Sequence, residues 1–103
     1  MDSWDSLQAA AWLTAVEVVG DTSAKLDGEL PTFASYNVLA YSLPRVLRHN
    51  PLGLTNGYWN AMTNITHLLI GRALGEELES IQVFGILLAT AGILCMAQGK
   101  QTL

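Results

Sequence analysis

The sequence predicts an all-α protein, an integral membrane bundle of four transmembrane helices. Half of the 103 residues are hydrophobic and only 14% are charged, against roughly 25% in an average soluble domain. The stretches at 30–44, 49–71 and 80–99 contain no Asp, Glu, Lys or Arg, and a helix needs about 20 residues to cross the hydrocarbon core. No strand-like alternation continues over a useful length.

One domain spans residues 1–103, and its helices are expected at residues 7–25, 30–47, 52–74 and 80–98. The first helix reaches the required length only if Glu17 and Asp21 are tolerated within it. Gly75 suits the C-terminal cap of the third helix, and Ser80 suits the N-cap of the fourth. Short connections join these segments, at residues 25–29, 48–52 and 75–79.

The composition excludes several classes of function. The net charge of −4 and the lack of a basic patch argue against nucleic acid as a partner. The single cysteine, Cys95, allows no intrachain disulfide and has no metal-ligand spacing around it. The chain shows no nucleophile–base pair, phosphate loop or zinc pattern. We therefore expect no enzyme activity, no cofactor and no metal.

The polar residues inside the apolar segments are the candidates for function. The mean hydropathy of +0.31 is low for a protein with several spanning helices, so such helices must carry polar residues that face an interior. Glu17 lies in a run of small and apolar residues, where a carboxylate is commonly a proton or cation site. Asp21 follows four residues later on the same helical face, which also carries Thr14. The alternative is a soluble helix whose carboxylates face water.

The third segment carries a polar stripe on one helical face: Asn56, Asn60, Thr63, Asn64 and His67. Trp59 borders this stripe. In a membrane it must face a wet cavity or other helices, where asparagine can also serve only to join helices by hydrogen bonds. The fourth segment places Gly85, Ala89 and Gly92 on one face, where small residues allow close helix packing.

Four short motifs occur in order along the chain. Ala15–Thr22 contains a glutamate followed three residues later by glycine, and Pro51–Asn60 contains proline-x-glycine followed by tryptophan. Gly75–Leu78 precedes the last helix, which carries Gly85 and Gly92 seven residues apart. In order and spacing these motifs resemble those of the small multidrug resistance family, the four-helix branch of the drug/metabolite transporter superfamily.

The resemblance implies an antiparallel homodimer in the inner membrane of the cell that dimerises through its last helix. It implies exchange of protons for a small cationic substrate, with Glu17 as the coupling carboxylate and Trp59 lining the pocket. The chain departs from the family at Asn56, where tyrosine is usual, and at Asn60, where a small or hydroxyl residue is usual. It also departs at Asp21, where a hydroxyl residue is common. A more polar cavity follows, suited to guanidinium-like compounds or polyamines.

Two functions are therefore expected, with a soluble helical bundle as a third alternative. The first is a proton-coupled exporter of small polar cations in the lipid bilayer, and the second is a structural or assembly subunit of a larger membrane complex. Fold alone cannot separate them. For the exporter, the dimer-packing residues are Gly85, Ala89 and Gly92, and the substrate- and proton-binding residues are Thr14, Glu17, Asp21, Asn56, Trp59, Asn60 and His67.

Overall fold

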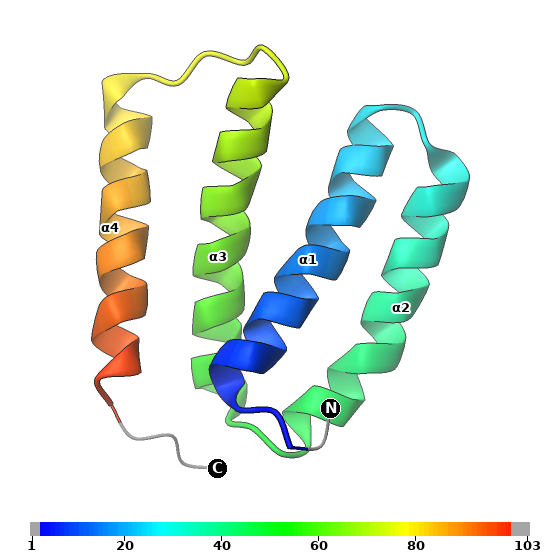
Figure 1. Cartoon of the computed structure of the whole chain (residues 1–103), viewed down its shortest axis with the longest axis vertical. Coiled ribbons are helices and arrows are strands. Elements are labelled where there is room, and N and C mark those ends of the chain that lie inside the picture. Colours follow the sequence, from blue (N-terminus) through cyan, green and yellow to red (C-terminus); the bar gives the residue numbers. More distant parts are fainter. Residues whose placement is uncertain (1–2, 100–103) are drawn as a thin grey trace.

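The computed structural model describes residues 3–99 and shows four α-helices joined by short connections (Figure 1). They are α1 (Ser6–Lys25), α2 (Glu29–Leu47), α3 (Leu52–Ala73) and α4 (Ser80–Ala97). The all-α prediction is confirmed, and each helix end lies within one residue of its expected position. Among residues 3–99, none of these helices combines the length and the apolar character that crossing a bilayer requires.

Local sequence explains where the helices begin and end. Asp5 caps α1: its side chain accepts a hydrogen bond from the Gln8 backbone N–H at 2.8 Å, and the Gln8 side chain accepts one from Asp5 N–H at 3.1 Å. The N-cap of α4 is Glu79 rather than Ser80, because the Gln82 side chain accepts from Glu79 N–H at 2.7 Å. Gly75 has a φ of 100° just after α3, a conformation that favours glycine.

The helices lie side by side in the order α4, α3, α1, α2 and form one flat layer (Figure 1). The dimensions of the chain are 40 × 35 × 15 Å. α1 packs against both α2 and α3, whereas α4 packs against α3. α1 and α3 run in the same direction, and α2 and α4 run opposite to them (Figure 1). The central place of α1 means that its side chains can reach two neighbouring helices.

The core is small and lies where α1 meets α2. Its buried residues are Ala9, Leu13, Val16, Leu39 and Val46, with Trp4, Trp12, Leu43, Leu47 and Trp59 packed around them. Trp12 Nε1–H donates a hydrogen bond to Ser42 Oγ at 2.8 Å, which satisfies the polar end of the indole. None of the α4 side chains that the structure describes is buried.

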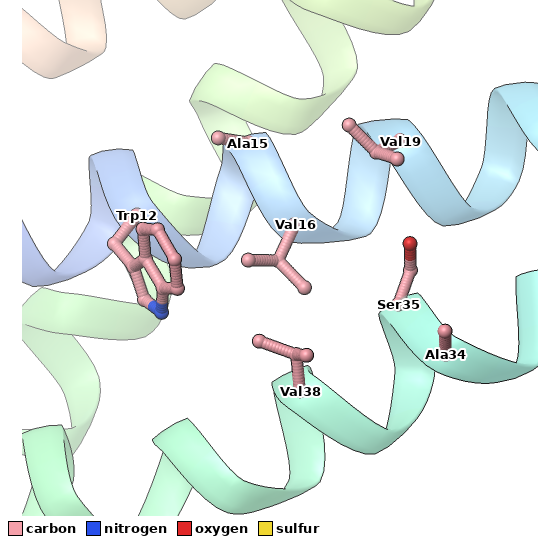
Figure 2. Close-up of a pocket in the computed structure, with 7 residues that line it drawn as sticks. All are labelled: Trp12, Ala15, Val16, Val19, Ala34, Ser35 and Val38. Atoms are coloured by element: carbon pink, nitrogen blue, oxygen red, sulfur yellow. The ribbon is translucent and has the colours of Figure 1, made fainter. Parts of the chain in front are cut away.

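Both broad faces of the layer leave large apolar side chains uncovered. α2 exposes Leu30, Phe33 and Val38. α4 exposes Ile81, Val83, Phe84, Leu87, Leu88 and Leu94. Between α1 and α2 an open apolar hollow of about 310 Å³ is lined by residues that include Trp12, Val16 and Val38 (Figure 2). So much uncovered apolar surface is typical of a protein that meets other protein chains or lipid.

α1 and α2 approach each other closely at Gly20. A Cβ atom at this position would lie 3.0 Å from Cε2 of Tyr36 and 3.1 Å from Cβ of Ser35. The second contact is the more restrictive, because a Cβ atom moves only with its backbone. Glycine at position 20 therefore sets the distance between the two helices.

We predict that Gly20→Val lowers the free energy of unfolding by about 1–3 kcal/mol, the usual cost of an overpacked contact. The matched control is Gly53→Val, because a Cβ atom at Gly53 of α3 meets nothing within 4 Å. The control should change stability by less than about 0.5 kcal/mol. Denaturant unfolding followed by far-ultraviolet circular dichroism measures both, and equal effects would contradict the close α1–α2 approach.

Candidate functional site

Two side-chain contacts fix how α1 and α3 are aligned. Near the start of both helices, Thr55 Oγ1 donates a hydrogen bond to Ser6 Oγ at 3.2 Å. Further along both helices, Nε2 of His67 lies 2.9 Å from Oδ2 of Asp21. Because the helices run in the same direction, residues between Ser6 and Asp21 lie level with residues between Thr55 and His67. The candidate site lies in this interval.

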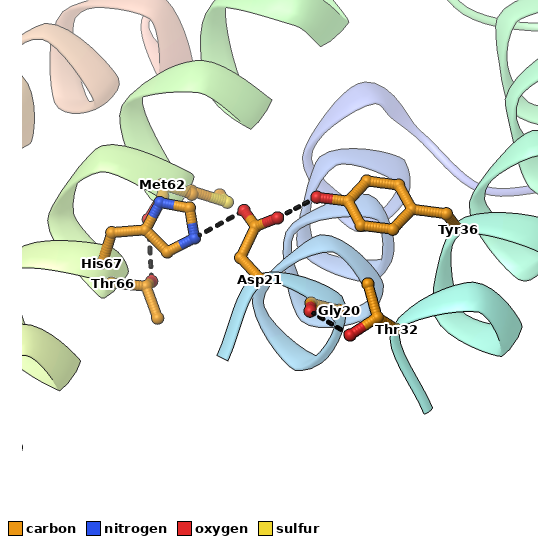
Figure 3. Close-up of polar contacts among 7 residues, drawn as sticks. All are labelled: Gly20, Asp21, Thr32, Tyr36, Met62, Thr66 and His67. Carbon is orange, nitrogen blue, oxygen red and sulfur yellow. Dashed lines mark hydrogen bonds and ion pairs between the residues drawn. The ribbon is translucent and has the colours of Figure 1, made fainter. Parts of the chain in front are cut away.

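Asp21 is held from both sides. The hydroxyl of Tyr36 on α2 donates a hydrogen bond to Oδ1, and His67 on α3 contacts Oδ2 (Figure 3). His67 Nε2 has no aligned hydrogen bond, so its contact with Asp21 is one of charge and proximity, and it is an ion pair when the imidazole is protonated. The Asp21 side chain is 32% exposed. One carboxylate on the central helix thus joins three helices.

Glu17 differs from Asp21 in its contacts, although it lies only one helical turn away. Its side chain is half-buried. Within residues 3–99, no hydrogen bond or ion pair engages its carboxylate. The sequence places both carboxylates on one helical face, and the structure shows that one of them is held and the other is available.

Three buried polar atoms in the same interval also have no hydrogen-bond partner among the described residues. They are Oγ1 of Thr14 on α1, and Oγ1 of Thr63 and Nε1 of Trp59 on α3. Thr14 is 8% exposed and Thr63 is 7% exposed. A buried polar group without a partner costs free energy and requires an explanation, such as a water molecule or ligand. The alignment of the helices places Thr63 at the level of Glu17, with Thr14 one turn before it and Trp59 nearer the start of the helices.

The rest of the polar stripe lies on the surface of the single chain. Asn56, Asn60 and Asn64 are exposed, whereas Thr63 is buried and His67 is half-buried. The expectation that the whole stripe faces an interior is therefore not met within one chain. The reason is that α3 has α1 on one side and α4 on the other, which leaves the face between them uncovered.

Part of the small-residue face of α4 borders α3 across an open hollow. Gly85 and Ala89 line an open hollow of about 390 Å³ between α3 and α4, together with His67. Direct contact between α3 and α4 occurs elsewhere: a Cβ atom at Gly57 of α3 would lie 2.9 Å from Sδ of Met96 on α4. A Cβ atom at Gly85 or Gly92 meets nothing within 4 Å. Their role in packing a dimer stays a prediction.

A second hollow, of about 220 Å³, lies at the end of the site where α1 and α3 terminate. Its lining includes Asp21, Lys25, His67 and Glu76. Nζ of Lys25 lies 3.6 Å from Oε2 of Glu76, and both side chains are largely exposed. Among residues 3–99, no three His, Cys, Asp or Glu side chains gather closely enough to hold a metal ion.

This interval contains or borders five residues that the sequence singles out as candidates: Thr14, Glu17, Asp21, Trp59 and His67. Tyr36, the α2 residue that donates to Asp21, has no signal in the sequence that marks it. Comparison with protein-family models, curated proteins and solved structures finds no match to the chain. Membership of the small multidrug resistance family therefore stays a prediction.

We predict that Thr63→Val raises the free energy of unfolding by about 1 kcal/mol, because it replaces a buried hydroxyl that lacks a partner by a methyl group of nearly the same size. Thr66→Val is the control, since Thr66 Oγ1 donates to the Met62 carbonyl at 2.7 Å. The control should give no gain in stability. A destabilised Thr63→Val variant in chemical unfolding would mean that this hydroxyl has a structural partner.

Proposed function

We propose that the chain is a proton-coupled exporter of small cations that works as a homodimer in a membrane. The observation that carries the proposal is the half-buried Glu17 carboxylate, which has no partner within residues 3–99. It lies level with the buried hydroxyl of Thr63 and one helical turn from that of Thr14, and neither hydroxyl has a partner among the described residues. A carboxylate with two unused hydroxyl acceptors near its level is suited to binding a cation with several N–H donors.

The chemistry of exchange follows from one carboxylate serving two cations. Ionised Glu17 attracts the charged cargo, and the hydroxyl oxygens of Thr14 and Thr63 accept hydrogen bonds from its N–H groups. The indole of Trp59 offers an aromatic surface to the same charge. When a proton binds Glu17, the charge that holds the cargo is lost and the cargo leaves. Binding and protonation are therefore mutually exclusive, which is the requirement for antiport.

The placement of polar residues supports a membrane location. Glu17 and Asp21 lower the apolar character of α1, and the asparagines of the stripe do the same on α3. These residues belong to the candidate site or to its rim, where polar groups in a membrane protein are expected. The uncovered apolar faces of α2 and α4 are suited to contact with lipid acyl chains.

The incomplete enclosure of the site supports a dimer. Asn56, Asn60 and Asn64 are exposed in one chain, and α4 buries none of its described side chains. A second copy placed against this face would cover the asparagines and complete a polar cavity around Glu17. The alternative is an assembly subunit, in which helices of other proteins would cover the same face.

We predict that Glu17→Gln abolishes pH-dependent binding of guanidinium, because the amide has neither the charge nor a titrating proton. The fold should be retained, since the two side chains are nearly equal in size. Glu77→Gln in the exposed α3–α4 connection is the control and should bind as the unmodified chain does. Isothermal titration calorimetry of the purified chain in detergent measures this effect. Unchanged binding in Glu17→Gln would favour the assembly subunit.

We predict that Gly92→Leu weakens the homodimer by at least about tenfold while the helical content of the chain is unchanged. There is room for a larger side chain within one chain, as nothing lies within 4 Å of a Cβ atom at Gly92. The same side chain would separate two closely packed helices. Thr90→Leu, on another face of α4, is the control. Analytical ultracentrifugation in detergent measures association, and a normal Gly92→Leu dimer would remove this face from the interface.

A further inference from the structure

The charges around the candidate site form pairs, with one exception. From α1 come Glu17, Asp21 and Lys25, from α3 comes His67, and from the α3–α4 connection comes Glu76. Lys25 pairs with Glu76 at 3.6 Å, and His67 pairs with Asp21 at 2.9 Å. α2 contributes the neutral hydroxyl of Tyr36. With the His67 imidazole protonated, the uncompensated charge of this group is that of Glu17.

Asp21 is poorly placed to bind cargo as a second carboxylate. Both of its oxygen atoms are engaged, Oδ1 by Tyr36 and Oδ2 by His67 (Figure 3). Cargo could recruit this carboxylate only by displacing the imidazolium, which would also break the contact between α1 and α3. A second positive charge on the cargo would then meet the positive charge of His67.

We infer that His67, by neutralising Asp21, restricts the site to cations with a single positive charge. This inference rests on the proposed function and specifies its substrate class: small monovalent organic cations, such as alkylguanidinium ions, in preference to diamines and polyamines. Glu17 binds the cargo, while His67 and Asp21 set how many charges the site accepts. His67 is thus a specificity-determining residue rather than a ligand.

The net charge of the site predicts how the preference for a dication changes from one variant to the next. With Glu17 and Asp21 ionised and His67 protonated, the three residues sum to one negative charge. His67→Gln gives two negative charges, and Asp21→Asn gives none. The double variant Asp21→Asn, His67→Gln returns to one negative charge. One added charge in a partly solvated site should change the preference for a dication by about tenfold.

The test compares two ligands of the same carbon chain that differ by one ammonium group, n-butylguanidinium and 4-aminobutylguanidinium. The measured quantity is the Kd of the dication divided by the Kd of the monocation, obtained by calorimetry on the purified full chain. We expect this ratio to fall about tenfold in His67→Gln, to rise in Asp21→Asn, and to return to within about threefold of the unmodified value in the double variant. Partial unfolding of a variant affects both ligands equally and cancels in the ratio.

The outcomes separate this inference from the proposed function. A residue that only stabilises the fold would change both Kd values by the same factor and leave the ratio unaltered. If binding depends on Glu17 but the ratio is the same in all four proteins, the charge assignment is wrong and the exporter proposal stands. If the unmodified chain binds neither cation, or binds them without Glu17, both proposals are wrong.

Discussion

The contact of Asp21 with Tyr36 and His67 is the interaction on which the arrangement of the first three helices depends. It is formed by the central helix, near the end that is furthest from the Thr55–Ser6 hydrogen bond. Together these contacts hold α1 and α3 in one alignment, and the tyrosine adds α2 to the same point. The alignment places Glu17 level with the buried hydroxyl of Thr63 and one helical turn from that of Thr14. A structural carboxylate therefore positions the carboxylate that we propose to be functional.

The flat layer leaves the proposed site incompletely enclosed within a single chain. A thickness of 15 Å allows each helix to bury only the sides that face its neighbours. The core is accordingly confined to the surroundings of α1, and α4 remains uncovered. Lipid can cover apolar side chains, but it cannot satisfy the amides of Asn56, Asn60 and Asn64. In the proposed dimer, a second copy of the chain would provide both polar partners and apolar contact.

Much of the fold could be predicted from the sequence, because uncharged stretches and capping residues mark the helices locally. The order of the helices in the layer could not be predicted, since it depends on contacts between distant residues such as Trp12 and Ser42. The candidate carboxylates were found because an acidic residue in an apolar run is unusual. The difference between their contacts could not be predicted, because nothing near Asp21 in the sequence identifies Tyr36 as its hydrogen-bond donor. The polar stripe predicted a shared helical face correctly, but a stripe cannot reveal whether the same chain covers it.

We propose that a proton and a cation compete for Glu17. This competition is measured by the release of protons when guanidinium is added to the purified chain in weakly buffered detergent solution. We expect release that saturates with guanidinium and does not exceed one proton per bound cation. Saturable binding of guanidinium with no proton release at any pH between about 5 and 9 would contradict it, because the two cations would then occupy separate sites.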